Sequence, residues 1–333
     1  MDMMVKPQLM RDAVIETIIE AAAKDRDILF ISADLGAAAL DGFRRDFPDQ
    51  FIHAGIAEQN MVDLASGLAL SGKKVFLYAM APFITARCYE QVKCVIASMN
   101  LPVTLIAVGV GLGYDHATLT HFTPEDIACM RALNGIEVLT PSDAPSAAAI
   151  ARACIDDPKF RYIRLERQPL ASLYHGGFDT ALEDGFGHLT AGSRVAIVAC
   201  GYLTHKALAA ADELRDAGIE AGVVDLVRAK PLDGNKLTDL FAGYDAVLTV
   251  EEQLLEGGMG SAVAEALIDA ADGRGGLPPI KRLGLRDGFE VVNGSRDELH
   301  RLYGIGTPDI AAAARDLAEA QSAEAQSAKA QPA

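Results

Sequence analysis

A glutamate that follows a glycine turn is the first residue whose type and position could support chemistry. Glu58 lies in HAGIAEQNM (residues 53–61), directly before a helical pattern of apolar residues. The helix dipole favours a carboxylate in the first turn, so a purely structural role is common for such a residue. A carboxyl group in this position can also take part in proton transfer. The local sequence leaves both roles open.

A second segment combines glycines with two histidines. GVGLGYD (109–115) has glycines at alternate positions but does not match G-x-G-x-x-G. Glycines allow tight turns at the carboxyl end of a strand, where open parallel sheets bind ligands. His116 and His121 follow, but the seven histidines show no H-E-x-x-H or similar spacing, and there is no P-loop. We therefore expect no metal site within this chain.

The elements that must position these residues alternate between strands and helices. Short apolar runs predict buried strands at 28–32, 75–79, 103–110 and 136–143. Helical patterns are found at 11–24, after Glu58, at 85–98 and at 127–133. In the helix after Glu58 we expect Met61, Leu64, Ala65 and Leu68 to face inward. Continuous apolar strands separated by helices predict a parallel sheet covered on both faces.

The same pattern restarts later in the chain and predicts a second, smaller α/β unit. Residues 195–200, 221–227 and 246–252 form further apolar runs, with a helical pattern at 204–217. The Gly-, Ser- and Asp-rich stretch before them has weak periodicity and predicts a connection between domains. The last residues are low in complexity, which fits a frayed helix or a disordered tail. The expected boundaries are a first domain at 5–172, a linker at 173–192, a second domain at 193–313 and a tail at 314–333.

The totals exclude several classes of partner and location. The chain has 333 residues, half of them hydrophobic, and a formal net charge of −16, so it is globular and repels nucleic acid and anionic lipid. Its five cysteines are scattered, without a C-x-x-C pair, which argues against a disulfide framework. The sequence shows no secretory signal and no apolar run of membrane-spanning length. We expect a cytoplasmic protein.

Taken together, several segments resemble the transketolase family of thiamine-diphosphate enzymes. GIAEQNMVDLASGLALSGKKVFLYAMAPFITARCYEQV, which contains Glu58, resembles the domain that binds the cofactor's pyrimidine. The resemblance continues in order through SADL, THFTPEDIACMRAL, VLTPSDA and IRLERQPL, and then through VEEQLLEGGMG and RDGFEVVNGSRDELHRLYGI. It covers nearly the whole chain apart from the tail. The resemblance implies a pyrimidine-binding domain followed by a transketolase C-terminal domain.

The resemblance assigns a cofactor role to several residues of the first domain. In this family a glutamate at the position of Glu58 bonds the aminopyrimidine and promotes the tautomer that removes the reactive proton of the cofactor. Phe83 matches the aromatic residue that stacks on the pyrimidine, although Met80 and Ala86 stand where other members have further aromatic residues. Arg87, four residues beyond Phe83, is expected in the same pocket. Asp34 of SADL matches an aspartate near the cofactor, but it could also cap the following turn.

Substrate contacts are implied in the same way. His121 matches a histidine that assists proton transfer at the substrate, which suits an imidazole near neutral pH. Arg11 and Arg167 match positions that hold a donor's phosphate, and guanidinium groups suit that geometry. Two other phosphate contacts, usually Ser and His, are replaced here by Ala38 and Ala107. The loop before His121 is longer than usual and lacks Gly-Pro, so Asp115, expected at the substrate, could be displaced.

The resemblance implies that one half of a complete active site comes from another chain. Full-length family members hold the cofactor's diphosphate and a divalent metal, Mg²⁺, in a preceding domain with a G-D-G sequence and a downstream Asn; no G-D-G occurs here. The resemblance therefore implies one subunit of a split enzyme, inactive alone, whose partner holds the diphosphate and Mg²⁺ in an α2β2 assembly. Gly257, Gly258 and Gly260 precede a helical pattern and fit either an anion-binding helix N-terminus or a tight turn.

The implied reaction moves a two-carbon ketol unit from a ketose, with or without a phosphate, to an aldehyde acceptor. Two alternatives remain open at this point. The first is a decarboxylating subunit, similar to deoxyxylulose-phosphate synthase or to the β-type subunit of 2-oxo-acid dehydrogenases. The second is a non-catalytic regulatory subunit, which the altered loop before His121 would fit. The sequence does not identify the sugar.

Overall fold

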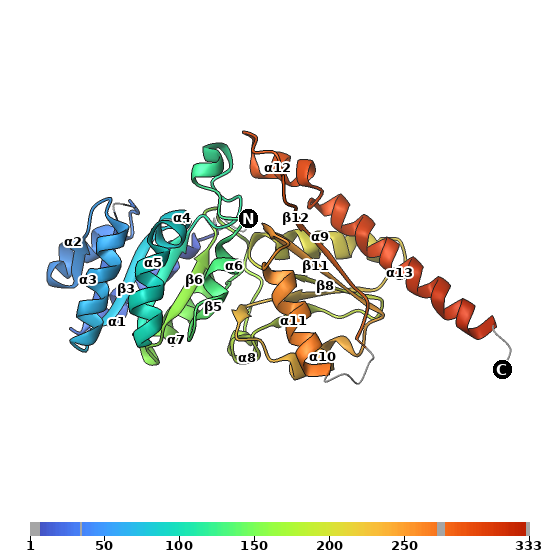
Figure 1. The fold of residues 1–333 in the computed structure, drawn as a ribbon, viewed down its shortest axis with the longest axis horizontal. Helices are drawn as coiled ribbons and strands as arrows, with labels where there is room; N and C mark the ends of the chain where they lie inside the picture. Colours follow the sequence, from blue (N-terminus) through green and yellow to red (C-terminus); the bar gives the residue numbers. More distant parts are fainter. Residues whose placement is uncertain (1–6, 34, 272–276, 331–333) are drawn as a thin grey trace, which may run out of the picture.

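The computed structural model describes residues 7–33, 35–271 and 277–330, which form two α/β units side by side (Figure 1). The first unit contains a sheet of seven strands in the order β10-β5-β6-β4-β3-β1-β2. Its strands are β1 (Ile28–Ser32), β2 (Phe51–His53), β3 (Lys74–Met80), β4 (Val103–Val108), β5 (Glu137–Leu139), β6 (Arg161–Leu165) and β10 (Arg228–Lys230). Only β10 runs antiparallel to its neighbour in this sheet.

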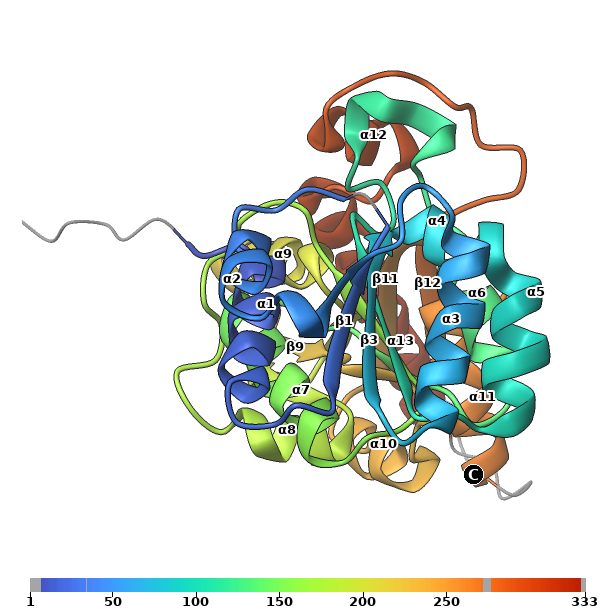
Figure 2. The same ribbon diagram turned by 90° about the vertical axis from the view of Figure 1, so that its left-hand side faces the viewer.

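Helices cover both faces of this sheet, as Figure 2 shows. The helical segments of the first unit are α1 (Met10–Ala22), α2 (Leu40–Asp46), η1 (Pro48–Gln50), α3 (Glu58–Leu70), α4 (Ala81–Ile84), η2 (Ala86–Cys88), α5 (Tyr89–Gln91), η3 (Val92–Ala97), η4 (Asp115–Thr120), α6 (Asp126–Arg131) and α7 (Ala144–Asp156). Side chains from α1, α2 and α7 share one core with the sheet. Those from α3, α6 and the α4–η3 segment form the core on the other face. The central strands are buried throughout because both faces are covered.

The second unit has five strands in the order β12-β11-β8-β9-β7. Its elements are β7 (Gly187–Thr190), β8 (Val195–Ala199), α9 (Tyr202–Asp216), β9 (Ala221–Asp225), α10 (Gly234–Phe241), β11 (Ala246–Leu254), α11 (Met259–Ala271), β12 (Ile280–Leu285), α12 (Arg296–Tyr303) and α13 (Thr307–Ala330). The helix α8 (Phe178–Asp184) precedes them, and its buried side chains pack in the core of the first sheet with α1 and α7. All its strands are parallel except β7, at one edge. The predicted fold class, two α/β domains built on parallel sheets, is confirmed, with one antiparallel edge strand in each sheet.

The stretch expected to be a linker, 173–192, is not an irregular connection. It contains the helix α8 and the strand β7, which pairs with β9 and so belongs to the second sheet. The signal was weak because β7 is short and only half-buried at an edge. The boundary expected at residue 313 falls inside α13, whose first half packs against the second sheet as far as Ala318.

Two expectations for the first domain are also wrong. The segment 85–98 is not one regular helix: a 3₁₀ turn, η2, precedes α5, and a π-helical segment, η3, follows it. In α3, Leu64 is 38 % exposed rather than inward, because the buried face is formed by Glu58, Met61, Val62 and Ala65, with other small residues. In the described ranges, no helix is both long enough and apolar enough to cross a membrane.

Candidate active site

The carboxyl ends of four parallel strands, β2, β3, β4 and β6, bring predicted site residues to one edge of the first sheet. Glu58 follows β2 after a four-residue turn, Phe83 follows β3, and the loop of residues 109–121 follows β4. Arg167 comes directly after β6. Ligands bind at this edge in open parallel sheets, so the topology itself assembles the candidate site.

Glu58 begins α3 and is buried, with 2 % of its surface exposed. The turn before it depends on Gly55, whose φ of 71° lies in the left-handed region that favours glycine. Ile56 in the same turn is 76 % exposed. Because the carboxyl group points inward from a helix start, it can bond a ligand that enters beside the helix.

Arg87 contacts two of the predicted cofactor-binding residues at once. Its Nη1 donates to Oε2 of Glu58 at 2.9 Å. Its guanidinium carbon lies 3.8 Å from the centre of the partly buried Phe83 ring. A planar, delocalised group with N–H donors therefore fits between the aromatic face and the carboxylate. An aminopyrimidine ring is also planar and delocalised, and its ring nitrogen can pair with a carboxyl group, so the residues present fit the pyrimidine of thiamine diphosphate.

Phe83 also links this pair to the loop after β4. The His121 ring lies 5.4 Å from the Phe83 ring, inclined at 65°. Nδ1 of His121 lies 2.9 Å from Oγ1 of Thr120, which leaves Nε2 for other contacts. His121 therefore lies beside the aromatic ring that the sequence predicts to stack on the cofactor.

Tyr114 is a residue of this cluster that the sequence reasoning missed. Its ring lies 5.3 Å from His121 and 5.2 Å from the guanidinium carbon of Arg167. Burial raises the pKa of Tyr114, and the positive charges of Arg167 and Arg11 oppose that rise. The glycines of GVGLGYD were the only indication in the sequence that a large side chain packs closely against this loop. A Cβ on Gly109 would lie 2.0 Å from the Tyr114 ring. That glycine is required for the ring to pack where it does.

The residues expected at the substrate have carboxylate partners within the chain. Arg167 is 3.8 Å from the carboxylate of Asp115, so the altered loop keeps Asp115 beside this arginine. Arg11 donates to Asp12 at 3.1 Å. Ala38 is exposed, whereas Ala107 is wholly buried in β4 and cannot line a substrate pocket. Asp34 falls outside the described residues.

The glycine turn before α11 does not form an open anion site. The Glu251 carboxyl group accepts the N–H groups of Met259 and Gly260, at the start of the helix. Burial raises the pKa of Glu251 to about 8, although those N–H donors and nearby arginines lower it. Since a side chain of the chain itself fills this helix terminus, the tight-turn interpretation of Gly257, Gly258 and Gly260 holds.

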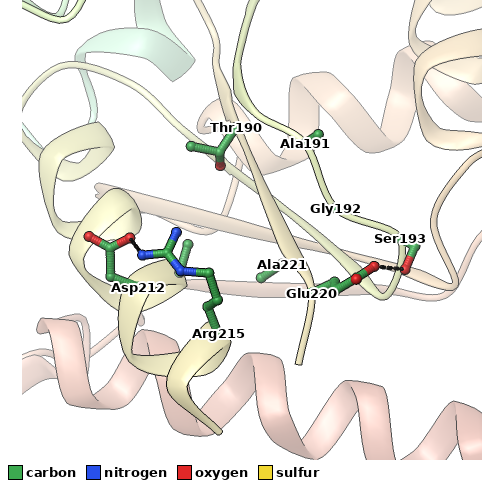
Figure 3. A pocket seen from close by; sticks show the side chains of 9 residues that line it. Thr190, Ala191, Gly192, Ser193, Asp212, Arg215, Glu220 and Ala221 are labelled. Carbon is green, nitrogen blue, oxygen red and sulfur yellow. Dashed lines mark hydrogen bonds and ion pairs between the residues drawn. The ribbon is translucent and has the colours of Figure 1, made fainter. Parts of the chain in front are cut away.

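A separate hollow of about 400 Å³ lies in the second unit, between the loop before β8 and the end of α9 (Figure 3). Arg215 at its wall donates to Asp212, and Ser193 donates to Glu220. None of its lining residues belongs to the cluster around Glu58. Its charged side chains all have partners within the hollow, and the hollow is separate from the candidate site.

This fold and this cluster define a class of enzyme subunits that hold the pyrimidine of thiamine diphosphate, and comparison with known proteins agrees. Residues 6–172 match the model of the transketolase pyrimidine-binding domain, and residues 187–310 match that of the transketolase C-terminal domain. The chain belongs to the transketolase family, whose members depend on thiamine diphosphate.

The relatives come in two lengths. The chain is 32 % identical over 305 residues to a subunit of the apulose-4-phosphate transketolase of Phocaeicola vulgatus, covering 91 % of this chain and 96 % of that protein. It is 34 % identical over 304 residues to 1-deoxy-D-xylulose-5-phosphate synthase of Syntrophus aciditrophicus, covering 90 % of this chain but 46 % of that protein.

One solved structure gives the same picture. A split-gene transketolase, described as an inactive β4 tetramer, superimposes with a TM-score of 0.82 at 32 % identity, covering 93 % of this chain and 98 % of that one. The chain therefore matches a transketolase subunit and a split-gene transketolase chain over almost their whole length, and the 1-deoxy-D-xylulose-5-phosphate synthase over about half of its length. This confirms the resemblance to a C-terminal-type transketolase subunit.

Proposed function

We propose that this chain is the pyrimidine-binding subunit of a two-component transketolase that transfers a ketol unit from a ketose to an aldehyde. The observation that carries the proposal is the placement of Arg87 between the Glu58 carboxylate and the Phe83 ring. That space suits an aminopyrimidine, and a relative of the same length is one subunit of a transketolase. When bound, thiamine diphosphate supplies the nucleophilic carbon and the electron sink for cleavage beside a carbonyl group.

The chain's own residues would divide the remaining work. Glu58 would bond the ring nitrogen of the pyrimidine and hold its proton, and Phe83 would stack on the ring face. Arg87 would move away from the face of the Phe83 ring, which the pyrimidine would then occupy, and would remain at the edge of that ring. His121, beside Phe83, would donate to or accept from the substrate oxygen as the proton moves. The second alternative, a non-catalytic subunit, has no use for a buried carboxylate opposite an aromatic ring.

Arg11 and Arg167 would bind an anionic group at the far end of the substrate. Asp115 would share this end of the site, since it lies 3.8 Å from Arg167. The relative from Phocaeicola vulgatus acts on a sugar phosphate, as its name states, which fits a site with two arginines. Asp34 is proposed near the cofactor from its position in the sequence alone.

A second chain would complete the site. We propose that this partner holds the diphosphate and Mg²⁺, that the two chains assemble as α2β2, and that the complex is cytoplasmic. Within the described ranges, no group of three or more His, Cys, Asp or Glu side chains is arranged to hold a metal ion. The proposal therefore assigns the Mg²⁺ site to the partner.

The test is reconstitution. The chain would be mixed with a candidate diphosphate-binding chain from the same organism, thiamine diphosphate and Mg²⁺, and supplied with phosphorylated and unphosphorylated ketoses and an aldehyde. We expect ketol transfer without release of CO₂ and no turnover by either chain alone. Release of CO₂ from a 2-oxo acid would favour the decarboxylating alternative. Turnover by this chain alone would refute the two-component proposal.

A further inference from the structure

We propose that the second unit of this chain is part of the active-site scaffold, because it holds the loop of residues 109–121 and so positions His121. The positioning residues are Glu252 on β11, Arg296 on α12 and Asn293 just before α12. This inference rests on the proposed function for the role of His121, and the contacts themselves belong to the structure.

Glu252 connects the second unit to the loop through a buried network. Its carboxylate accepts from Nε and Nη2 of Arg296, at 2.7 and 2.6 Å, and it contacts Nε2 of His300. The same carboxylate accepts the backbone N–H of Leu112 at 3.0 Å. All three side chains are buried. A buried, charge-assisted network of this kind tolerates little displacement, so it fixes the loop backbone at Leu112.

The loop can approach Glu252 only because residue 111 is glycine. A Cβ on Gly111 would lie 2.3 Å from Oε2 of Glu252, and its φ of 59° is in the left-handed region. Arg296 extends the network, since its Nη1 donates to Gln168, whose Nε2 donates to the carbonyl of Gly113 at 3.1 Å. Gln168 is the neighbour of Arg167. The same network therefore contacts both the loop of residues 109–121 and the segment that carries Arg167.

A second contact holds the far part of the loop. Nδ1 of His116 lies 2.8 Å from Oδ1 of Asn293, and Nδ2 of Asn293 donates to the carbonyl of His116 at 3.3 Å. In Figures 1 and 2 the helical turn η4 lies beside α12 and the segment before it, above the two sheets. This pair, His116 with Asn293, is solvent-exposed and therefore removable without disturbing a core.

Apolar side chains complete the docking at both ends of the loop. Leu112 and Phe122 pack in one buried cluster with Leu285, Leu299 and Ile305 of the second unit. Phe122 follows His121 directly. With Leu112, His116 and Phe122 all held by the second unit, His121 has little freedom to move away from Phe83, which is the preorganisation that proton transfer needs.

The first test measures the loop itself and needs neither partner nor cofactor. Asn293→Ala in the full chain should speed amide hydrogen exchange in peptides that span residues 112–121 and leave β3 unchanged. Asn235→Ala, an exposed asparagine at the start of α10, is the matched control and should change neither. Unaltered exchange at 112–121 in Asn293→Ala would overturn the proposal.

The second test separates positioning from a merely structural contact. In the reconstituted enzyme, Asn293→Ala and His116→Ala should each lower kcat by about three- to tenfold, with the KM for thiamine diphosphate unchanged. The double variant should be no worse than either single one, because both remove the same contact. An unchanged kcat despite faster exchange would overturn the positioning role. Absence of ketol transfer in the wild-type complex would count against the proposed function instead, and the exchange result would still decide whether the second unit holds the loop.

Discussion

The guanidinium carbon of Arg87 lies 3.8 Å from the centre of the Phe83 ring. The same guanidinium bonds the buried Glu58. Arg87 therefore makes both contacts proposed for the cofactor's pyrimidine, so the guanidinium and the pyrimidine compete for the same two partners.

This competition predicts an unusual direction for one variant. Arg87→Ala should lower the KM for thiamine diphosphate by up to about tenfold, because a cation–π contact and a partly exposed ion pair together contribute on the order of 1 kcal/mol. Cofactor titration of the reconstituted enzyme measures this. A higher KM would show instead that Arg87 binds the cofactor, as the sequence first indicated.

Removing the ring from Phe83 should have the opposite effect. Stacking of a base on an aromatic side chain contributes about 1–3 kcal/mol, so Phe83→Ala should raise the KM for thiamine diphosphate about ten- to hundredfold. Phe83→Tyr is the conservative control and should stay near the wild type. If Phe83→Ala binds the cofactor normally, Phe83 is a core residue and the stacking role is wrong.

The position of Tyr114 predicts a matched pair of variants. Tyr114→Ala should raise the KM for the ketose donor by about two- to fivefold, because Arg167 loses the ring beside it. Gly109→Ala should reproduce this effect, since the new Cβ would displace the ring and the φ of 79° disfavours it. Tyr114→Phe keeps the ring and should behave like the wild type. Donor titrations that show no change in Tyr114→Ala would exclude Tyr114 from the substrate site.

Stability should depend on pH through Glu251. Because burial raises its folded-state pKa to about 8, the folded chain keeps a proton that the unfolded chain releases above about pH 4.5. The free energy of unfolding is therefore lowered progressively from about pH 5 to pH 8, and this loss is complete above about pH 8.

Glu251→Gln removes this titration while keeping a similar shape. At each pH, the melting temperature of Glu251→Gln is compared with that of the wild type. This difference should shift in favour of the variant as the pH is raised from about 5 to about 8. The shift corresponds to a change on the order of a few kcal/mol in the free energy of unfolding. At about pH 5 the melting temperature of the variant itself can lie below that of the wild type, because the amide oxygen accepts from only one of the two N–H groups at the start of α11. A difference between the two proteins that stays constant with pH would contradict the raised pKa.

The sequence predicted the elements that carry a strong hydrophobic pattern. Strands such as β1, β3 and β8 are mostly apolar and buried, so their positions could be predicted. Prediction from the sequence failed where tertiary contacts decide the conformation. The π-helical segment η3 has no local signal, and β7 is a short edge strand whose partner β9 lies more than thirty residues away.

The site was predictable only in part. Glu58, Phe83, Arg87 and His121 could be found because their motifs resemble those of a known family, and the structure places them together. Tyr114 and the Glu252 network could not, since their contacts join residues separated by up to 140 positions. The spacing of Gly109 and Gly111 gave one indication of close packing in this loop. Gly109 makes room for the Tyr114 ring, and Gly111 makes room for the Glu252 side chain.

Turnover of a Glu58→Gln variant tests the central claim most directly. The reconstituted complex of Glu58→Gln with the diphosphate-binding chain should assemble normally, as size-exclusion chromatography can check, and its kcat should fall by about 10²–10⁴-fold, the usual effect of losing a positioned acid–base group. Glu20→Gln, an exposed glutamate on α1, is the matched control and should keep wild-type activity. Full ketol transfer by Glu58→Gln would contradict the assignment of this carboxyl group to the cofactor.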